Sequence, residues 1–225
     1  MQSDLAANLN DIHRRIGDAA TRAGRDAREI KLVAVSKTHP PTVLRQAIDA
    51  GATILGENKV QEAESKIIEL GRNAAEWHLI GHLQSNKARK AVQLFDVIQS
   101  LESLELARRL ERICGEEGRN ELSVFIEVDV AGEETKAGIP ESELRPLVEF
   151  LRKCEHLRLR GLMIVPPYDD DVENTRPFFK RLREIRDNLL SGGDLSMGMS
   201  HDFETAIEEG ATVVRVGTAI FGRRD

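Results

Sequence analysis

Hydrophobic residues along the chain follow two periodicities that alternate from one end to the other. Short β-branched runs, typical of buried strands, are separated by stretches whose apolar residues recur every three or four positions, as on one helix face. The first such stretch carries Leu5, Leu9, Ile12 and Ile16, which predicts an amphipathic helix ahead of the first strand. Eight strands are predicted, at residues 31–38, 53–57, 77–81, 96–100, 123–131, 157–165, 194–199 and 212–217.

Eight strands that alternate with helices, preceded by one extra helix, predict a (β/α)₈ TIM barrel. No low-complexity segment or flexible linker divides the sequence, so residues 1–225 are expected to form a single domain. The alternative is an open, doubly wound sheet, which a glycine-rich turn after the first strand would favour. The turn at residues 37–41 carries a lysine, a histidine and two prolines instead, and this favours the barrel.

Composition narrows the classes of function. The net charge of −6 and the pI near 5.6 argue against nonspecific binding to nucleic acid or to membrane surfaces. No apolar stretch approaches the roughly 20 residues that a membrane helix needs, and the first residues lack the pattern of a secretory signal. Cys114 and Cys154 lack metal-ligand spacing and predict no disulfide framework, so we expect a cytoplasmic protein with reduced thiols.

A lysine stands at the end of the first apolar run. On a strand over residues 31–38, the side chains of Val33, Val35 and Lys37 share one face. A lysine amine beside a mostly buried strand costs free energy unless it is neutralised, paired or used covalently. Lys37 therefore fits imine formation with a carbonyl compound, and it fits equally a lysine that reaches solvent or pairs with a carboxylate.

The ends of the last two predicted strands form a second candidate site. In a TIM barrel the loops after strands 7 and 8 frequently bind a phosphate group, with help from a helix N-terminus. Ser200 precedes a helical pattern over residues 201–209, so we expect it to be an N-cap with free backbone amides beside it. Gly217 ends the eighth strand and permits a close approach of the backbone.

Arg215 lies two residues before Gly217, on the strand face that we assign to the barrel interior. Its guanidinium stays charged under ordinary conditions. Two interpretations are open: an ion pair with a carboxylate such as Glu57 or Asp129, or a hydrogen bond to a ligand acceptor.

Six blocks of sequence carry these features in a fixed order. They lie at residues 33–38, 56–58, 77–87, 161–163, 195–202 and 215–222. Together they resemble the pyridoxal 5′-phosphate (PLP) homeostasis protein family, which is related to the N-terminal barrel domain of bacterial alanine racemase. The resemblance covers nearly the whole chain and implies an alanine racemase-like TIM barrel with PLP as its cofactor.

The resemblance implies a role for each matching residue. Lys37 would hold PLP as an internal aldimine, and Ser200 with the backbone amides of Gly217 and Thr218 would bind the phosphate. Arg215 would donate a hydrogen bond to the pyridine nitrogen and keep it unprotonated, which weakens the ring as an electron sink.

Asn58 and Met163 would line the ring pocket. Lys136 matches a lysine that some family members use as a secondary capture site, and an ordinary solvated lysine is the alternative.

The resemblance also bears on catalysis. Alanine racemase needs a second acid/base, a tyrosine from a separate C-terminal domain of the partner subunit, and this sequence ends at Asp225 after the eighth strand. Its single tyrosine, Tyr168, is expected on an exposed acidic loop. We therefore expect a monomeric PLP carrier without robust catalytic activity, with apo-enzymes as candidate partners. The alternatives are a PLP-dependent racemase or lyase, and an aldolase that uses its own lysine.

Other polar residues predict structure rather than chemistry. His78 and His82 are four apart, which on a strand is roughly 13 Å and too far for one metal ion, so no metal site is expected. The pattern around Glu62, Glu64 and Lys66 predicts a solvated helix face.

Overall fold

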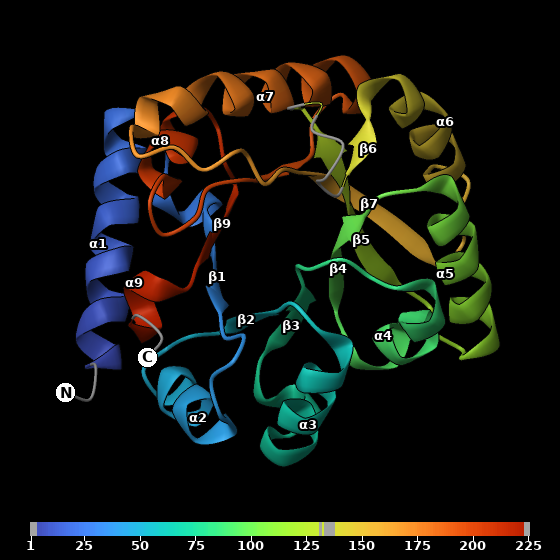
Figure 1. Ribbon diagram of the computed structural model, residues 1–225, viewed down its shortest axis with the longest axis horizontal. Helices are drawn as coiled ribbons and strands as arrows, with labels where there is room; N and C mark the ends of the chain where they lie inside the picture. Colours follow the sequence, from blue (N-terminus) through green and yellow to red (C-terminus); the bar gives the residue numbers. More distant parts are fainter. Residues whose placement is uncertain (1–3, 131, 133–137, 223–225) are drawn as a thin grey trace.

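The computed structural model describes residues 4–130, 132 and 138–222. Strands and helices alternate along these residues, as Figure 1 shows. The strands are β1 Lys31–Val35, β2 Ile54–Glu57, β3 Glu76–Leu79, β4 Val97–Leu101, β5 Leu122–Asp129, β6 Ile139–Pro140, β7 Leu157–Met163, β8 Asp194–Ser196 and β9 Val213–Val216. The helices are α1 Leu5–Arg22, α2 Pro41–Asp49, α3 Val60–Leu70, α4 Ala88–Leu94, α5 Leu104–Glu116, α6 Glu141–Leu151, α7 Arg176–Leu190, α8 Phe203–Glu208 and α9 Thr218–Phe221.

The sheet closes on itself. Hydrogen-bonded neighbours follow the order β4-β3-β2-β1-β9-β8-β7-β5, and a further pairing of β4 with β5 completes the ring. Every pairing is parallel, and the two-residue β6 adds only to the end of β5. In the part of the chain described, eight strands thus form a closed parallel barrel surrounded by helices, which confirms the predicted TIM barrel.

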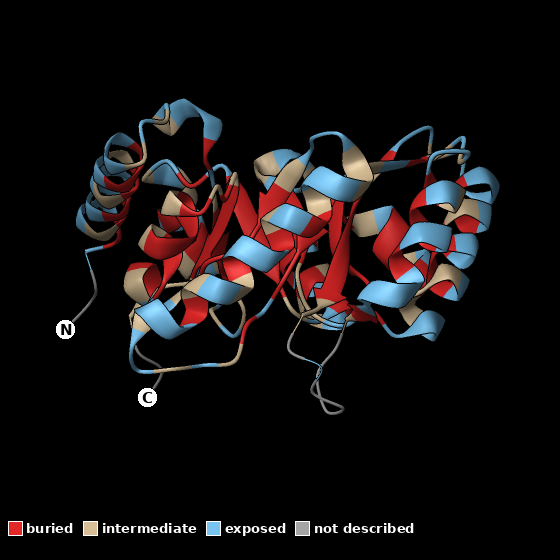
Figure 2. Ribbon diagram, turned by 90° about the horizontal axis from the view of Figure 1, so that it is seen from above, coloured by how far each residue is buried: buried red, intermediate tan, exposed pale blue. Residues whose placement is uncertain are grey.

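Apolar side chains fill the barrel on both sides of its wall. Inside, one residue from each of six strands forms a compact cluster of Val33, Ile54, Val97, Phe125, Met163 and Val213. A larger cluster lies between the outer faces of the strands and the helices. Figure 2 shows the buried strands in the centre and the helices with their exposed faces outward, as amphipathic helices require.

The extra N-terminal helix is confirmed as α1. Its buried face, which includes Leu9 and Ile12, contacts α8 and α9 on the outside of the barrel. Arg15 and Arg22 of this helix form ion pairs with Glu204 of α8. Helix α1 therefore braces the two elements that follow the last barrel strands. None of the helices within the described residues is long and apolar enough to cross a membrane.

Several strands end earlier than the apolar runs predict. Strand β1 ends at Val35 rather than at residue 38, and β8 ends at Ser196 rather than at residue 199. After β1, the Ser36 carbonyl oxygen and the Thr38 amide bond to side chains of α3, as described below. Most of the candidate site residues therefore lie beyond the strand ends at the C-terminal end of the barrel, whereas Arg215 lies on β9 and Met163 on β7.

Candidate functional site

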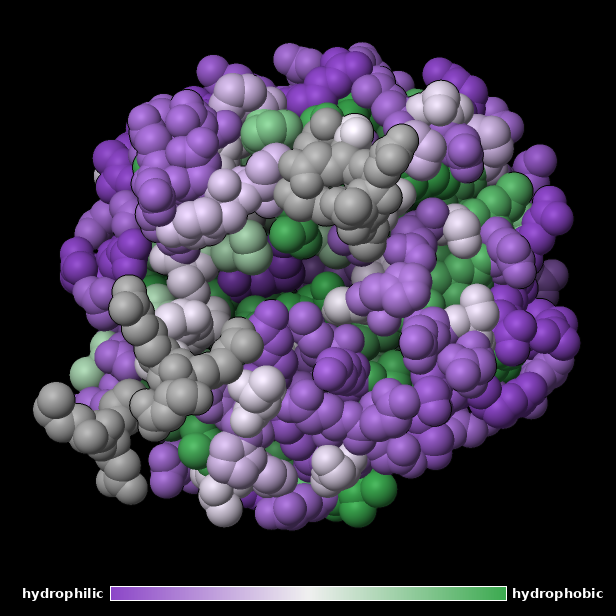
Figure 3. Space-filling model, viewed as in Figure 1, coloured by the Kyte–Doolittle hydropathy of each residue, from purple (hydrophilic) through white to green (hydrophobic). Residues whose placement is uncertain are grey.

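A cavity of about 780 Å³ opens at the C-terminal end of the barrel. Figure 3, viewed as in Figure 1, shows this face hollowed near its centre, with hydrophilic and hydrophobic side chains both lining the hollow. Six of the seven residues that the sequence singled out line the cavity: Lys37, Asn58, Ser200, Arg215, Gly217 and Thr218. The barrel therefore brings together groups from its first, second, seventh and eighth βα turns.

Lys37 lies in the turn after β1, and α3 anchors the backbone on both sides of it. Lys66 Nζ donates to the carbonyl oxygen of Ser36 at 2.9 Å, and the amide of Thr38 donates to a carboxylate oxygen of Glu62. Thr38 has a φ of 69°, in the left-handed region that non-glycine residues seldom adopt without support. These bonds hold the turn in the conformation that directs Lys37 to the cavity.

A buried ion pair supports this turn from below. Glu57 is fully buried, Lys66 is 3% exposed, and Glu57 Oε1 lies 2.8 Å from Lys66 Nζ. Burial raises the pKa of Glu57, while hydrogen bonds from Lys66 and from Ser36 Oγ act to lower it. The predicted solvated face of Glu62, Glu64 and Lys66 is therefore wrong for Lys66, because a carboxylate from the neighbouring strand end neutralises its amine.

Ser200 joins the two loops of the predicted phosphate site. Its Oγ accepts hydrogen bonds from the amide of Gly217 at 3.1 Å and from that of Ala219 at 3.4 Å. The hydroxyl thus holds the loop after β8 against the turn after β9. The two strand ends come together as the barrel prediction requires, although they are 17 residues apart in the sequence.

The predicted N-cap role of Ser200 is wrong. Helix α8 begins at Phe203, with Asp202 at its N-cap position. The Ser200 hydroxyl bonds across to the β9 turn instead, and Asp202 Oδ1 accepts from the Met199 amide at 2.7 Å. Burial raises the pKa of Asp202, against the hydrogen bond from Met199 and the charge of Arg215.

Two glycines allow the loops to approach. Gly198 has a φ of 93°, and a Cβ there would lie 2.6 Å from the Ala206 Cβ, so a side chain would displace α8. A Cβ on Gly217 would lie 3.3 Å from the Val35 carbonyl oxygen. The turn after β9 can therefore pack closely against the end of β1.

Arg215 points into the barrel and forms the floor of the cavity. It is 4% exposed, and it donates to Ser196 Oγ at 2.7 Å and to the Ile164 carbonyl oxygen at 2.8 Å. Burial lowers the pKa of Arg215 to about 10, while the charges of Glu127 and Asp202 act to raise it. The guanidinium is thus a cation at neutral pH and can only donate hydrogen bonds.

The ion pair considered between Arg215 and Glu57 is absent from the structure, because Glu57 is paired with Lys66. Glu127 is the carboxylate whose charge acts most strongly on Arg215. Burial raises the pKa of Glu127 to about 7, and the charge of Arg215 acts against that rise.

The remaining predicted ligand contacts differ in their positions. Asn58 lines the cavity, and its Oδ1 is buried without a hydrogen-bond partner among the described residues. Met163 is fully buried in the apolar cluster of the barrel interior, outside the set of side chains that line the cavity. Tyr168 is 74% exposed, as expected, yet it also lines the cavity rim with His201, their ring centroids 5.5 Å apart.

Sequence reasoning did not single out several other residues of the cavity wall, among them His39 and Val165. His39 stacks on the ring of Phe221 at 4.8 Å, and Val165 is exposed at the end of β7. Both follow a strand end, which is the one sequence signal that could have found them.

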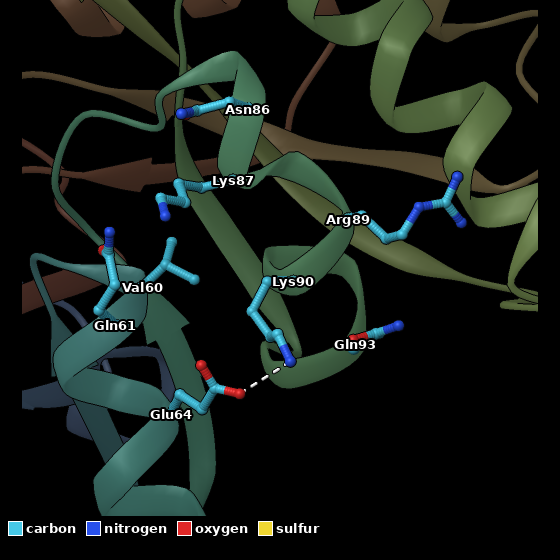
Figure 4. Close-up of a pocket in the computed structure, with 8 residues that line it drawn as sticks. All are labelled: Val60, Gln61, Glu64, Asn86, Lys87, Arg89, Lys90 and Gln93. Carbon is cyan, nitrogen blue, oxygen red and sulfur yellow. Dashed lines mark ion pairs between the residues drawn. The ribbon is translucent and has the colours of Figure 1, made fainter.

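A second, smaller cavity of about 420 Å³ lies between α3 and α4 (Figure 4). Two of its cations are paired with carboxylates, since Lys90 pairs with Glu64 at 2.7 Å and Arg89 pairs with Glu116 and Glu117 of the neighbouring α5 end. The cavity at the end of the barrel is therefore the better candidate site.

Two further predictions concern a metal site at His78 and His82, which was not expected, and a secondary capture site at Lys136. His78 is on β3 and bonds to Glu76 and Gln99, whereas His82 pairs with Glu102, so the two histidines do not converge. No cluster of three or more metal-ligating side chains is found in the part of the chain that is described. Lys136 lies outside the described residues.

Comparison with known proteins identifies the family. The model of the alanine racemase N-terminal domain family matches residues 7–225. Pyridoxal phosphate homeostasis proteins of Aquifex aeolicus and Escherichia coli K12 are each 42% identical to this chain, over 96% and 99% of its length and 96% and 98% of theirs. PipY of Synechococcus elongatus, solved with PLP bound, is 38% identical with a TM-score of 0.84, over 97% of this chain and all of that one. This chain therefore belongs to the pyridoxal phosphate homeostasis protein family and has its alanine racemase-like barrel.

Proposed function

We propose that this chain binds PLP covalently through Lys37 and acts in PLP homeostasis, holding the cofactor and delivering it to apo-enzymes. One observation carries the proposal: Lys37, the Ser200–Gly217 bridge and Arg215 line the same cavity. They offer an amine, a cradle of hydroxyl and backbone groups, and a fixed cation. PLP carries a matching aldehyde, phosphate and ring nitrogen, and PipY was solved with PLP bound.

The residues present fit this cofactor. Asn58 Oδ1 is buried without a partner and faces a cavity, so it is an acceptor available to a ligand. The Lys37 amine would bind the aldehyde carbon with loss of one water. Ser200 with the amides of Gly217 and Thr218 would hold the phosphate, and Asn58 would contact the ring.

Arg215 favours storage over turnover. PLP, when bound, supplies an electron sink that is strongest when its ring nitrogen is protonated. Arg215 can only donate a hydrogen bond, so it would keep that nitrogen unprotonated. Efficient proton transfer on both faces of a substrate also needs a second positioned base. We therefore infer a carrier rather than an enzyme.

Borohydride trapping followed by mass spectrometry tests the Lys37 assignment. Wild-type protein loaded with PLP should be yellow and should carry the reduced label on Lys37. Lys37→Ala should lose the visible band, whereas the exposed Lys59→Ala should keep it. A label on another lysine, or an unchanged band in Lys37→Ala, would overturn the proposal.

Delivery is tested separately by the rate at which loaded protein reactivates an apo-enzyme, compared with free PLP at the same concentration. Reactivation that is no faster and no more complete than with free PLP would argue against the carrier role.

One observation favours a catalytic alternative: Tyr168 lines the cavity beside His201. A PLP-dependent racemase or lyase would use such a residue as its acid or base. Loss of the optical rotation of L-alanine at an enzymatic rate, abolished by Tyr168→Phe, would favour this alternative over the carrier.

We also propose a monomer in the reducing cytoplasm. Within the described residues, the large hydrophobic side chains that are exposed are Ile68, Val165 and Tyr168, and the last two belong to the cavity. Both cysteines are free thiols. Light scattering after size exclusion would test the oligomeric state, and a dimer mass would refute the monomer.

A further inference from the structure

A line of hydrogen-bonded side chains crosses the barrel interior from the cavity floor to the opposite end. Arg215 Nη1 lies 2.7 Å from Ser196 Oγ, and Ser196 Oγ lies 2.6 Å from Gln99 Oε1. Gln99 Nε2 lies 2.7 Å from His78 Nδ1, and His78 Nε2 lies 2.9 Å from Glu76 Oε1. The contact of Ser196 on β8 with Gln99 on β4 spans strands that are far apart around the barrel.

The line is buried except at its far end. Ser196 and Gln99 have no exposed surface, His78 is 2% exposed and Arg215 is 4% exposed. The Glu76 side chain is 44% exposed, at the first residue of β3. A buried polar line of this length is costly unless each member is satisfied, and each of its members has a partner.

The orientation of the Gln99 amide sets the direction of the bonds along the line. A guanidinium has no acceptor, so Ser196 Oγ must accept from Arg215 and can give its own proton to Gln99 Oε1. The Gln99 amide nitrogen, which only donates, then faces His78 Nδ1. His78 must therefore be the neutral tautomer with its proton on Nε2, and this proton is donated to the Glu76 carboxylate.

The line matters to Arg215 because other anchors are few. Among the described residues no carboxylate lies within ion-pair distance of its guanidinium, which is held by Ser196 and by the Ile164 carbonyl oxygen. With a cation at one end and a carboxylate at the other, the bonds of the line polarise one another in the same sense. Removing the Gln99 side chain from the line should therefore make the position of Arg215 less fixed, without changing a residue that lines the cavity.

We propose that Gln99 and His78 are positioning residues for Arg215: through Ser196 they fix the guanidinium in the orientation in which it meets the ligand. The inference rests on the proposed function, since the ligand is PLP. It adds that Gln99 and His78, whose side chains do not line the cavity, contribute to how firmly the cavity binds its cofactor.

The test compares two substitutions at Gln99, neither of which touches the cavity. Gln99→Met keeps the volume and removes both bonds, so PLP should bind about tenfold more weakly, as expected for the loss of one buried polar link. Gln99→Glu keeps an acceptor for Ser196, so the affinity should return to within about threefold of wild type. Val97→Ala, which changes the apolar cluster of the same interior, serves as the control for packing.

Nitrogen-15 NMR of the His78 ring supplies a readout in the absence of PLP. In the wild type, Nδ1 should be unprotonated and Nε2 protonated. In Gln99→Glu a carboxylate oxygen would face Nδ1 in place of the amide nitrogen, so Nδ1 should carry a proton. A merely structural role for Gln99 would not move this signal in that way.

The outcomes separate the two proposals. A wild-type His78 with its proton on Nδ1, or Gln99→Met with wild-type affinity, would overturn the positioning role and leave PLP binding intact. If the wild type did not bind PLP, the proposed function would fail, and the His78 signal would still decide the direction of the line. If Gln99→Met did not fold, an unprotonated Nδ1 of His78 in Gln99→Glu would be enough to refute the inference.

Discussion

Lys66 and Glu57 form an ion pair of 2.8 Å that is closed to solvent and lies directly against the turn that carries Lys37. Lys66 also binds the carbonyl oxygen of Ser36, one residue before Lys37. The turn that carries Lys37 is therefore held in place by a second lysine, whose amine bonds to Ser36, Glu57 and Glu62. Because Lys37 lines the cavity and Lys66 is buried in an ion pair, separate predictions can be made for ligand binding and for stability.

Replacing Lys66 by methionine should leave Glu57 as a buried carboxylate without its cation. Breaking a buried pair on one side costs about 3–5 kcal/mol of unfolding free energy. The turn should loosen as well, so PLP binding should weaken even though Lys37 is intact. Urea denaturation measures the first effect and absorbance titration the second. The exposed Lys153→Met is the matched control, and equal stability of the two variants would contradict a structural role for Lys66.

Ser200→Ala should weaken the binding of PLP, because it removes a predicted phosphate ligand and the bridge to the amides of Gly217 and Ala219. Loss of a hydrogen bond to a charged group corresponds to about a tenfold to hundredfold higher Kd. Equilibrium titration with PLP measures the change, and Ser142→Ala on the exposed side of α6 should bind as the wild type does. Affinity for pyridoxal, which lacks the phosphate, should change little in Ser200→Ala. An equal loss for both ligands would place Ser200 away from the phosphate.

Gly198→Ala should destabilise the fold. Its φ of 93° is unfavourable for any side chain, and the new Cβ would lie 2.6 Å from the Ala206 Cβ. The two effects together should cost about 2–4 kcal/mol. Gly118→Ala has a φ of 66° and no atoms within 4 Å, so it should cost only about 1 kcal/mol. Denaturation curves of the two variants compare the losses of unfolding free energy. Equal losses would mean that α8 shifts to accommodate the new Cβ at little cost.

Glu127 should make the protein less stable as the pH rises. Burial raises its pKa from 4.5 to about 7, against the charge of Arg215, so the folded state holds a proton that the unfolded state releases. This contribution is complete below pH 4.5 and is lost as the pH rises through about 7. The side chain of the Glu127→Gln variant does not ionise, so the variant lacks this loss of stability. Relative to the wild type, the variant should therefore gain about 2–3 kcal/mol between pH 4.5 and about pH 8.

Denaturation at the two pH values measures this difference. The exposed Glu69→Gln should show no such gain. A difference between Glu127→Gln and wild type that did not vary with pH would contradict the raised pKa.

The elements of the barrel were predictable because they depend on local pattern. The alternation of β-branched runs with amphipathic stretches located eight barrel strands, and the spacing of Leu5, Leu9, Ile12 and Ile16 located α1. Placing Lys37, Ser200 and Arg215 at strand ends was enough to expect them in one cavity, since a barrel gathers its strand ends. Several strand ends, such as that of β1, were predicted too late, because the bonds that shape the turn after β1 come from α3.

The sequence by itself determined the fold class, the chemistry of the strand ends and the family, because periodicity and side-chain type are properties of single positions and their near neighbours. Only the tertiary structure decided that Lys66 is buried on Glu57, that Ser200 bridges two loops rather than capping α8, and that Gln99 joins β4 to β8. Each of these depends on which distant residue lies within hydrogen-bond reach. Closing the barrel sets those distances, and the pattern of one strand carries no information about the strand opposite.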